Sequence, residues 1–222
     1  MITIEKGGDS FEIHRLVQLV TQKWVERCGD SKRWQAVAVE VVAKAFPDGS
    51  YGNWKTCRTL LLHTLQVLSY SLGSSQSMLD RASLLYNLAW YNWIQGRYEM
   101  AEAEGQESLT LRERFLPNKN IRIYDSAEIL ALVLSSQGKY ADAEAMNRQT
   151  LEISEEVLGK THPDTLTSVY CLAYLLQNRH EYGEASILYQ RACTGYKLSL
   201  GSEHPTTKAC INHYSAMLDS LK

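Results

Sequence analysis

The chain has 222 residues, of which 45% are hydrophobic, so it can bury a core in one or two domains. Its 23 basic and 25 acidic residues give a formal net charge of −2, and nucleic-acid binding normally needs a clustered basic face. No apolar run approaches the roughly 20 residues of a membrane span, and the N-terminus does not read as a signal peptide. Composition therefore predicts a cytoplasmic protein that binds neither nucleic acid nor membranes.

The cysteines are odd in number and scattered, and no two of them form a CxxC pair. This usage predicts small buried side chains and not a disulfide framework. The five positions are Cys28, Cys57, Cys171, Cys193 and Cys210.

The N-terminal third predicts a hairpin followed by helices. Short β-prone runs at residues 2–5 and 10–14 flank a turn with two glycines, which is typical of a β-hairpin. Helical patterns then cover residues 15–28, 31–45 and 53–72. The second of these helices carries an apolar stripe that we expect to face the core: Trp34, Val37, Ala38, Val41, Val42 and Ala45. We predict that residues 1–75 form one domain, a hairpin with a helical cap.

From about residue 84 to residue 205 the sequence repeats itself every 42 residues. Sets of identical residues keep this step: Tyr98, Tyr140 and Tyr182; Ala101, Ala143 and Ala185; Leu88, Leu130 and Leu172. A fixed period of this size marks a repeat array in which each unit buries its apolar face against the next. The predicted fold is all-α, a right-handed superhelix of antiparallel helix pairs over residues 76–222, closed by a C-terminal capping helix.

Each repeat divides into two helices joined by a short turn. Gly96 and Gly138 suit two of the three turns, because glycine leaves a helix easily. Each second helix begins at a tyrosine and has an alanine three residues later, where two helices can cross closely. Pro163 and Pro205 suit the first position of a helix, which predicts a capping or turn role for the histidines before them.

The tyrosine, alanine and glycine positions resemble the tetratricopeptide pattern, whose basic unit has 34 residues. The 8 additional residues (42 − 34) are about two helical turns, as in the repeats of the kinesin light chain type. Leu-Gly-Lys-Thr-His-Pro-Asp-Thr at 158–165 and Leu-Gly-Ser-Glu-His-Pro-Thr-Thr at 200–207 resemble the signature between such repeats. The segment at 11–24 resembles the end of the winged-helix region in fungal NOD-like receptors, which joins an NB-ARC ATPase to a repeat array.

The sequence departs from these families at three points. The link after the first full repeat, Leu116-Pro-Asn-Lys-Asn-Ile-Arg-Ile-Tyr, lacks the His-Pro signature. The chain contains no NB-ARC module, so ATP-driven switching is not expected within it. The asparagine that holds a peptide backbone in the kinesin type occurs only at Asn87, whereas Ile129, Cys171 and His213 take its place in the later repeats. Peptide recognition led by the backbone is therefore not implied along the whole array.

Catalytic, metal and cofactor motifs fail on spacing. Gly159-Lys160-Thr161 lacks the glycine that a phosphate-binding loop needs five residues before Gly159, where Ser154 stands. His180-Glu181 has no second histidine at the spacing of a zinc helix. We predict no catalytic residue, no metal site and no cofactor.

A second face of each first helix follows the spacing i, i+4, i+7. The tetratricopeptide resemblance implies that this face lines a concave groove, here with aromatic walls around the carboxylate of Glu128. The predicted groove residues are Tyr86, Asn87, Trp90, Trp93, Glu128, Tyr170, Tyr174 and Gln177. The alternative for the two tryptophans is packing against the predicted helix at 53–72, since aromatic stripes are usually core.

We therefore predict a non-catalytic interaction or ligand-sensing module that binds a peptide, a partner protein or a small apolar molecule. The alternative is a cyclase or isomerase with an aromatic pocket, in which Glu128 or Asp219 acts as the acid. An enclosed cavity around Glu128 would favour the enzyme, and an open groove would count against it. The oligomeric state stays open, with the hairpin edge and the C-terminal helix as candidate contacts.

Overall fold

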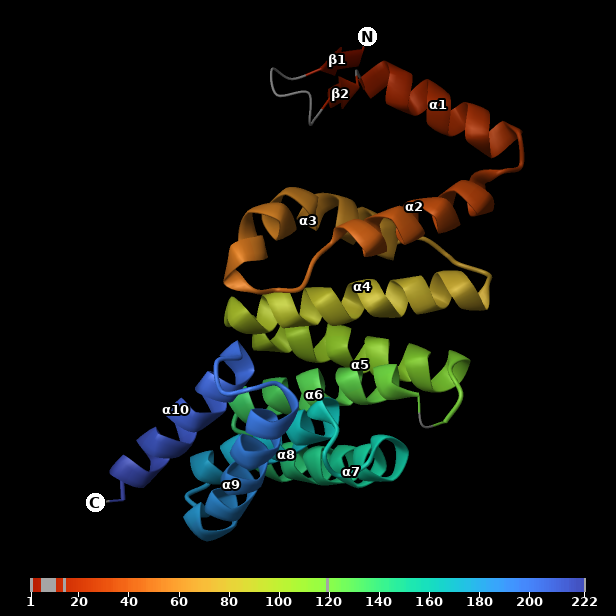
Figure 1. The fold of residues 1–222 in the computed structure, drawn as a ribbon. Coiled ribbons are helices and arrows are strands. Elements are labelled where there is room, and N and C mark those ends of the chain that lie inside the picture. The colour runs from red at the N-terminus through yellow and green to blue at the C-terminus, as the bar shows by residue number, and fades with distance from the viewer. Residues whose placement is uncertain (1, 5–10, 14, 119, 222) are drawn as a thin grey trace.

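The computed structural model describes residues 2–4, 11–13, 15–118 and 120–221, and these residues are almost entirely helical. In chain order the helices are α1 Arg15–Arg27, α2 Ser31–Ala45, the 3₁₀ turn η1 Tyr51–Asn53, α3 Trp54–Leu68, α4 Ser75–Ile94, α5 Tyr98–Phe115, α6 Ile121–Ser136, α7 Tyr140–Leu158, α8 Pro163–Asn178, α9 Tyr182–Ser199 and α10 Pro205–Asp219. Figure 1 shows them stacked from α1 at the top to α7, α8 and α9 at the bottom, with α10 at the left.

At the N-terminus the strands β1 Ile2–Ile4 and β2 Phe11–Ile13 pair antiparallel, with Thr3 opposite Glu12. The predicted two-glycine turn falls in residues 5–10, which lie outside the described residues. The hairpin as a unit therefore stays a prediction, while the fold class of the described chain is helical.

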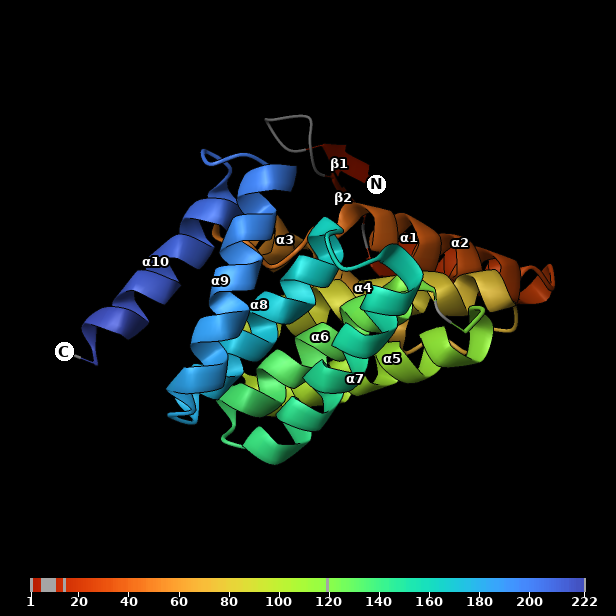
Figure 2. The same ribbon diagram turned by 60° about the horizontal axis from the view of Figure 1, so that its bottom comes forward.

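The predicted 42-residue period is confirmed in the helix boundaries. The second helices α5, α7 and α9 begin at Tyr98, Tyr140 and Tyr182. From α2 onward each helix packs on the next, and α4, α6, α8 and α10 also contact one another in sequence, as Figure 2 illustrates. These first helices contact one another directly as well as through the second helices, so they form the inner layer of the array. The right-handed sense of the superhelix stays a prediction.

The predicted role of the two histidines is confirmed. His162 and His204 are the N-cap residues of α8 and α10, and each ring Nδ1 accepts a hydrogen bond from the backbone N–H two residues on, at 3.2 and 3.3 Å. Proline takes the next position, where a missing N–H leaves no helical hydrogen bond unmade. Local sequence signals thus set where these helices begin.

Two hydrophobic cores hold the array. The first joins α2 and α3 to α4 through Val39, Cys57, Val67 and Leu88, and the second runs from Leu109 on α5 to Met217 on α10. The three alanines that keep the repeat step are fully buried, as expected at close helix crossings: Ala101, Ala143 and Ala185. The first core crosses the predicted boundary at residues 75 and 76, so the division into two domains stays a prediction.

The predicted core stripe of α2 is wrong for most of its residues. Val39, which the stripe omitted, is fully buried, whereas Trp34 is 49% exposed and Val41 is 59% exposed. The reason lies in the tertiary packing, because α4 packs on the side of α2 that carries Val39. The apolar side chains of α2 span a wider face than its neighbouring helices cover.

The turn after α8 departs from its two counterparts in a way that a substitution can test. Gly96 and Gly138 have φ angles of 74° and 79°, and His180 occupies the same repeat position with φ 65°. A side chain costs roughly 1–2 kcal/mol in this left-handed conformation. His180→Gly removes this cost but also removes the hydrogen bond between His180 Nδ1 and Tyr182 Oη, at 2.6 Å. The net effect should be a stabilisation of about 0.5–1 kcal/mol.

Chemical denaturation of His180→Gly against the parent chain measures this gain. Asn178→Gly is the matched control, because Asn178 is the last residue of α8 and glycine weakens a helix. A His180→Gly variant no more stable than the parent would show that the turn carries no strain.

Candidate functional site

The inner-layer helices carry the predicted groove residues, and the structure divides these residues into separate groups. The first is a pair of tryptophans near the end of α4. The rings of Trp90 and Trp93 lie 5.4 Å apart between centroids, and Trp93 Nε1 donates to Ser136 Oγ on α6 at 2.8 Å. Both indoles are half-buried. Trp93 thus links the first repeat to the second.

Trp90 lies against the loop between α2 and α3. A Cβ placed on Gly49 would come within 2.6 Å of Trp90 Cδ1, so the glycine backbone lies directly on the indole. This contact belongs to the loop that precedes the predicted helix at 53–72, and packing of the tryptophans against that helix stays a prediction.

Asn87, the asparagine expected to hold a peptide backbone, holds the chain's own backbone. Its Nδ2 donates to the carbonyl oxygen of Phe46 at 2.9 Å. Phe46 is buried, and its ring meets Tyr91 edge-on at 6.4 Å. Phe46 and Ser50 both have extended backbone angles. Residues 46–50, which we call the α2–α3 loop, therefore occupy the inner face at α4.

Tyr86 lies in a charged cluster between α4, α5 and α6. The guanidinium of the buried Arg112 stands 4.9 Å from the Tyr86 ring centroid and 3.9 Å from Asp125 Oδ2. Burial, and after it the negative charges of Asp125 and Glu128, raise the pKa of Tyr86 to about 12. Arg112 also donates to the backbone oxygen of Arg122, so it braces the start of α6.

Glu128 is half-buried on α6, and its carboxylate accepts a hydrogen bond from Ser168 Oγ on α8. Desolvation raises the pKa of Glu128 to about 7, and the charges of Asp125 and Asp164 act in the same direction. The Ser168 hydroxyl opposes this shift by stabilising the carboxylate. At neutral pH the group is therefore divided between the acid and the carboxylate.

Tyr170 and Tyr174 form an aromatic surface with His213, which the site prediction did not include. Tyr170 Oη lies 2.7 Å from His213 Nδ1, and the His213 ring stands 5.8 Å and 5.5 Å from the centroids of Tyr170 and Tyr174. Tyr174 is 37% exposed and His213 is exposed as well. We call these three residues of α8 and α10 the tyrosine–histidine platform.

Gln177 is engaged away from this platform. Its Oε1 accepts a hydrogen bond from Tyr189 Oη on α9 at 2.7 Å, and the Tyr189 side chain is fully buried. Gln177 therefore supports the packing of α9 on α8.

The structure thus joins some predicted residues and separates others. It pairs Trp90 with Trp93, brings Tyr170 and Tyr174 to the same His213 ring, and places Tyr86 within electrostatic reach of Glu128. Within the described residues, the two tryptophans make no direct ring contact or hydrogen bond with the platform. His213 could have been found from the sequence, because it lies 126 residues, three periods, after Asn87.

Five pockets along the described chain lie outside these groups. The two largest, of about 730 and 810 Å³, lie among α1, α2 and α3 and around the turn that joins α4 to α5. None of the five is lined by a predicted groove residue. The enclosed cavity around Glu128 that the enzyme alternative requires is not among them.

The fold and its period define a class, the helical repeat proteins built from paired antiparallel helices. Family comparison names it: residues 81–117 and 124–198 match two family models, each described as a tetratricopeptide repeat. These two stretches of the chain therefore carry tetratricopeptide repeats, and such repeats indicate a protein-interaction module.

The chain is similar to a nucleotide-binding leucine-rich repeat (NLR)-like protein of Hyaloscypha variabilis. The two are 33% identical over 112 residues, which are 50% of this chain and 11% of the relative. The match agrees with the resemblance to fungal NOD-like receptors. Because the match covers about a tenth of the relative, the relative's activity does not transfer to this chain.

No helix among the described residues is long and apolar enough to cross a membrane. Within the same residues no three His, Cys, Asp or Glu side chains gather as a metal site would require. The cytoplasmic location, the oligomeric state and the small apolar ligand stay predictions.

Proposed function

We propose that the array binds an extended peptide segment of a partner protein along its inner face, from α6 to α10. The observation that carries this proposal is the tyrosine–histidine platform, where aromatic side chains on two neighbouring inner helices are partly exposed and fixed by a hydrogen bond. Rigid aromatic surfaces bury much apolar area at little cost in side-chain entropy.

The first repeat supports a peptide as the ligand, because it already holds one. The α2–α3 loop lies on α4, where the Asn87 amide donates to the Phe46 carbonyl and the Phe46 ring meets Tyr91. The inner layer can thus hold a backbone segment by one polar contact and one aromatic pocket. Since that end is filled by the chain itself, we assign partner binding to the later repeats.

Glu128 suggests the polar part of the ligand. Burial and the negative charges of Asp125 and Asp164 disfavour the ionised form of its carboxyl. A positive charge placed beside the carboxyl would offset them and favour ionisation. We propose that the bound segment carries a Lys or Arg near Glu128 and an apolar or aromatic side chain on the platform.

The similarity to an NLR-like protein supports a place for this peptide binding within a larger receptor. We propose that such an array serves as the ligand-sensing part of a larger receptor, in which partner binding biases the remainder of the receptor. No observation in the described residues supports the cyclase or isomerase alternative. Glu128 lines none of the five pockets, and its carboxylate accepts a hydrogen bond from Ser168.

Selection from a random peptide library on the immobilised full chain, followed by calorimetric titration of an enriched peptide, tests the proposal. Tyr174→Ala should weaken binding at least about 10-fold, because it removes half-exposed aromatic contact area without opening the core. Circular dichroism should show unchanged helicity.

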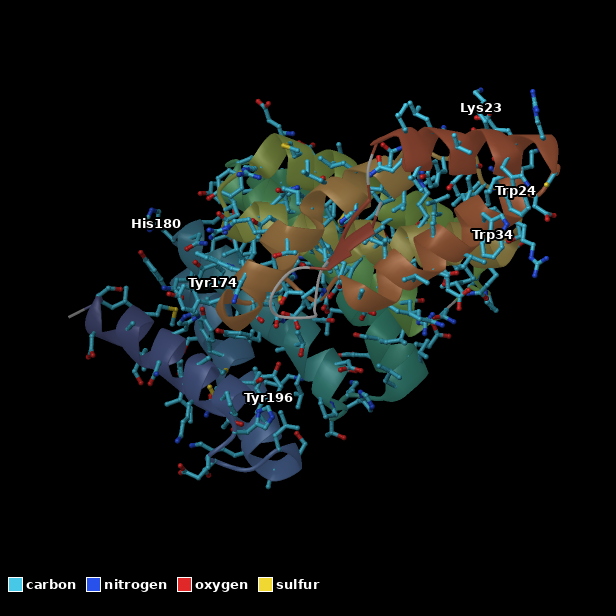
Figure 3. All side chains as sticks on the ribbon, turned by 90° about the horizontal axis from the view of Figure 1, so that it is seen from above. Lys23, Trp24, Trp34, Tyr174, His180 and Tyr196 are labelled. Atoms are coloured by element: carbon cyan, nitrogen blue, oxygen red, sulfur yellow. The ribbon has the colours of Figure 1, made fainter. Side chains whose placement is uncertain are left out.

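Tyr51→Ala is the matched control. Tyr51 is 81% exposed in η1, which precedes α3 and is not part of the platform, and its loss should leave the affinity unchanged. Figure 3 shows how far Tyr174 lies from the N-terminal helices that carry Trp24 and Trp34. Equal effects of the two substitutions, or a selection that enriches no peptide, would contradict binding at the platform.

A further inference from the structure

We infer that Cys193 on α9 and Cys210 on α10 are a site of reversible disulfide formation that fastens the last helix to the array. Their Sγ atoms lie 2.9 Å apart in the reduced chain. A disulfide has its sulfurs about 2.05 Å apart, so the two side chains need to move by less than about 1 Å. The two helices are already in place for the bond.

The pair differs from the other cysteines in its surroundings. Cys28 is exposed on the turn after α1, and Cys57 and Cys171 are buried singly on α3 and α8. Cys193 is 7% exposed and Cys210 is fully buried, both in the core between α9 and α10. One pair of this kind is no disulfide framework, so the bond adds to a fold that does not depend on it.

Electrostatics favours Cys193 as the sulfur that reacts first. The pKa of Cys193 is lowered, because the Cys210 thiol donates a hydrogen bond to its sulfur and Lys197 contributes a nearby positive charge. The pKa of Cys210 is raised by its hydrogen bond with Cys193, by burial, and by the negative sulfur beside it. Thiol exchange proceeds through the thiolate, so the proton is lost at Cys193.

The oxidant we assign is a low-molecular-weight disulfide such as glutathione disulfide. The Cys193 thiolate attacks one of its sulfurs and releases one glutathione thiolate, which leaves a mixed disulfide on Cys193. Cys210 then loses its proton and attacks Cys193 Sγ, which forms the internal bond and releases the second glutathione. Two protein thiols and one glutathione disulfide thus give one protein disulfide and two glutathione thiols.

The helix that moves to admit the oxidant is α10. It packs only against α9 and α8 among the described helices, and its fully buried residues are Thr207, Cys210 and Met217. Terminal elements with few buried contacts open most readily. Once formed, the bond closes a loop across the turn between α9 and α10 and opposes that opening.

Mass spectrometry of the full chain equilibrated with glutathione buffers tests the bond directly. Trypsin should release residues 192–197 joined to residues 209–222 from the oxidised protein, and dithiothreitol should separate them. Cys28, being exposed, serves as an internal control that reacts with the oxidant as a mixed disulfide. If Cys28 is modified while Cys193 and Cys210 are both recovered as free thiols, the inference is overturned.

A second measurement concerns the opening of α10. Limited trypsin cleavage at Lys208, in the first turn of α10, should be slower in the oxidised than in the reduced chain by about 10-fold or more. The difference should persist in Cys171→Ser and vanish in Cys210→Ser and in Cys193→Ser. Equal cleavage of both forms in the parent chain would show that the bond does not fasten α10.

Since α10 carries His213, the bond would also steady the tyrosine–histidine platform, and this consequence alone rests on the proposed function. Peptide binding that fails in both redox forms would count against the platform, whereas absence of the linked tryptic peptide would count against the disulfide.

Discussion

Replacing Gly49 by alanine is expected to destabilise the protein by about 3 kcal/mol, the upper part of the range for overpacked positions. A Cβ at this position would lie 2.5 Å from the backbone nitrogen of Tyr91 and 2.6 Å from its Cα. These are backbone atoms in the last turn of α4, whose buried face packs in the first core, so they cannot move aside as a flexible side chain could.

The loss is expected to be local as well as global. Lifting residue 49 from α4 would break the hydrogen bond from Trp54 Nε1 to the Gly49 carbonyl, at 3.0 Å, and would loosen Phe46 in its pocket. Hydrogen exchange should therefore rise in residues 46–50 before it rises in α6 to α9. Urea denaturation measures the change in the free energy of unfolding of the whole chain. It is repeated at several temperatures, because repeat arrays can unfold in stages.

Gly52→Ala provides the matched control three residues away. A Cβ there meets nothing within 4 Å, so the same added methyl group should leave stability close to that of the parent. If Gly49→Ala and Gly52→Ala unfold alike, the α2–α3 loop does not lie on α4 as described, and the occupied inner face at Asn87 loses its support.

Replacing Glu128 by glutamine is expected to stabilise the protein at alkaline pH and to leave it unchanged near pH 4. Burial raises the pKa of Glu128 from its ordinary 4.5 to about 7 in the folded chain. Below about pH 4.5 the group is protonated in both states. As the pH rises from there through 7, the unfolded chain gives up its proton more readily, so the parent chain loses stability.

The expected difference above pH 7 is roughly 1–3 kcal/mol in favour of Glu128→Gln, since each pKa unit corresponds to about 1.4 kcal/mol. The parent and the variant are compared by chemical denaturation at intervals between pH 4 and pH 8. Some slope should persist in the variant, because burial also raises the pKa of Glu104 to about 7.

Glu152→Gln makes the same chemical change at an exposed position of α7 and serves as the control. Its difference from the parent should not grow with pH in this range. Parallel stability curves for the parent chain and Glu128→Gln would contradict the desolvated carboxyl.

Much of the array could be predicted from the sequence. The period placed the tyrosines that begin α5, α7 and α9, and the His-Pro pairs placed the starts of α8 and α10. These signals act over a few residues: a proline without an N–H, a ring nitrogen that caps the helix, a glycine with positive φ. The tetratricopeptide resemblance predicted from them is confirmed by the family match.

The site was predicted less well, because its residues meet across repeats. Nothing in the local pattern indicates that Asn87 bonds Phe46 or that Trp93 bonds Ser136, contacts that span 41 and 43 residues. The buried side of α2 was mistaken for a similar reason. An amphipathic pattern shows which side chains are apolar, but the neighbour decides which of them are covered.

The sequence by itself determined that this protein is an array of helix pairs with a 42-residue step, because helix starts, helix ends and close crossings are set by local chemistry repeated along the chain. Only the tertiary structure decided which inner face is free. It placed the α2–α3 loop on α4, joined His213 to Tyr170, and brought Cys193 to Cys210. Those contacts depend on how successive helices stack in space, which residue spacing within one helix does not specify.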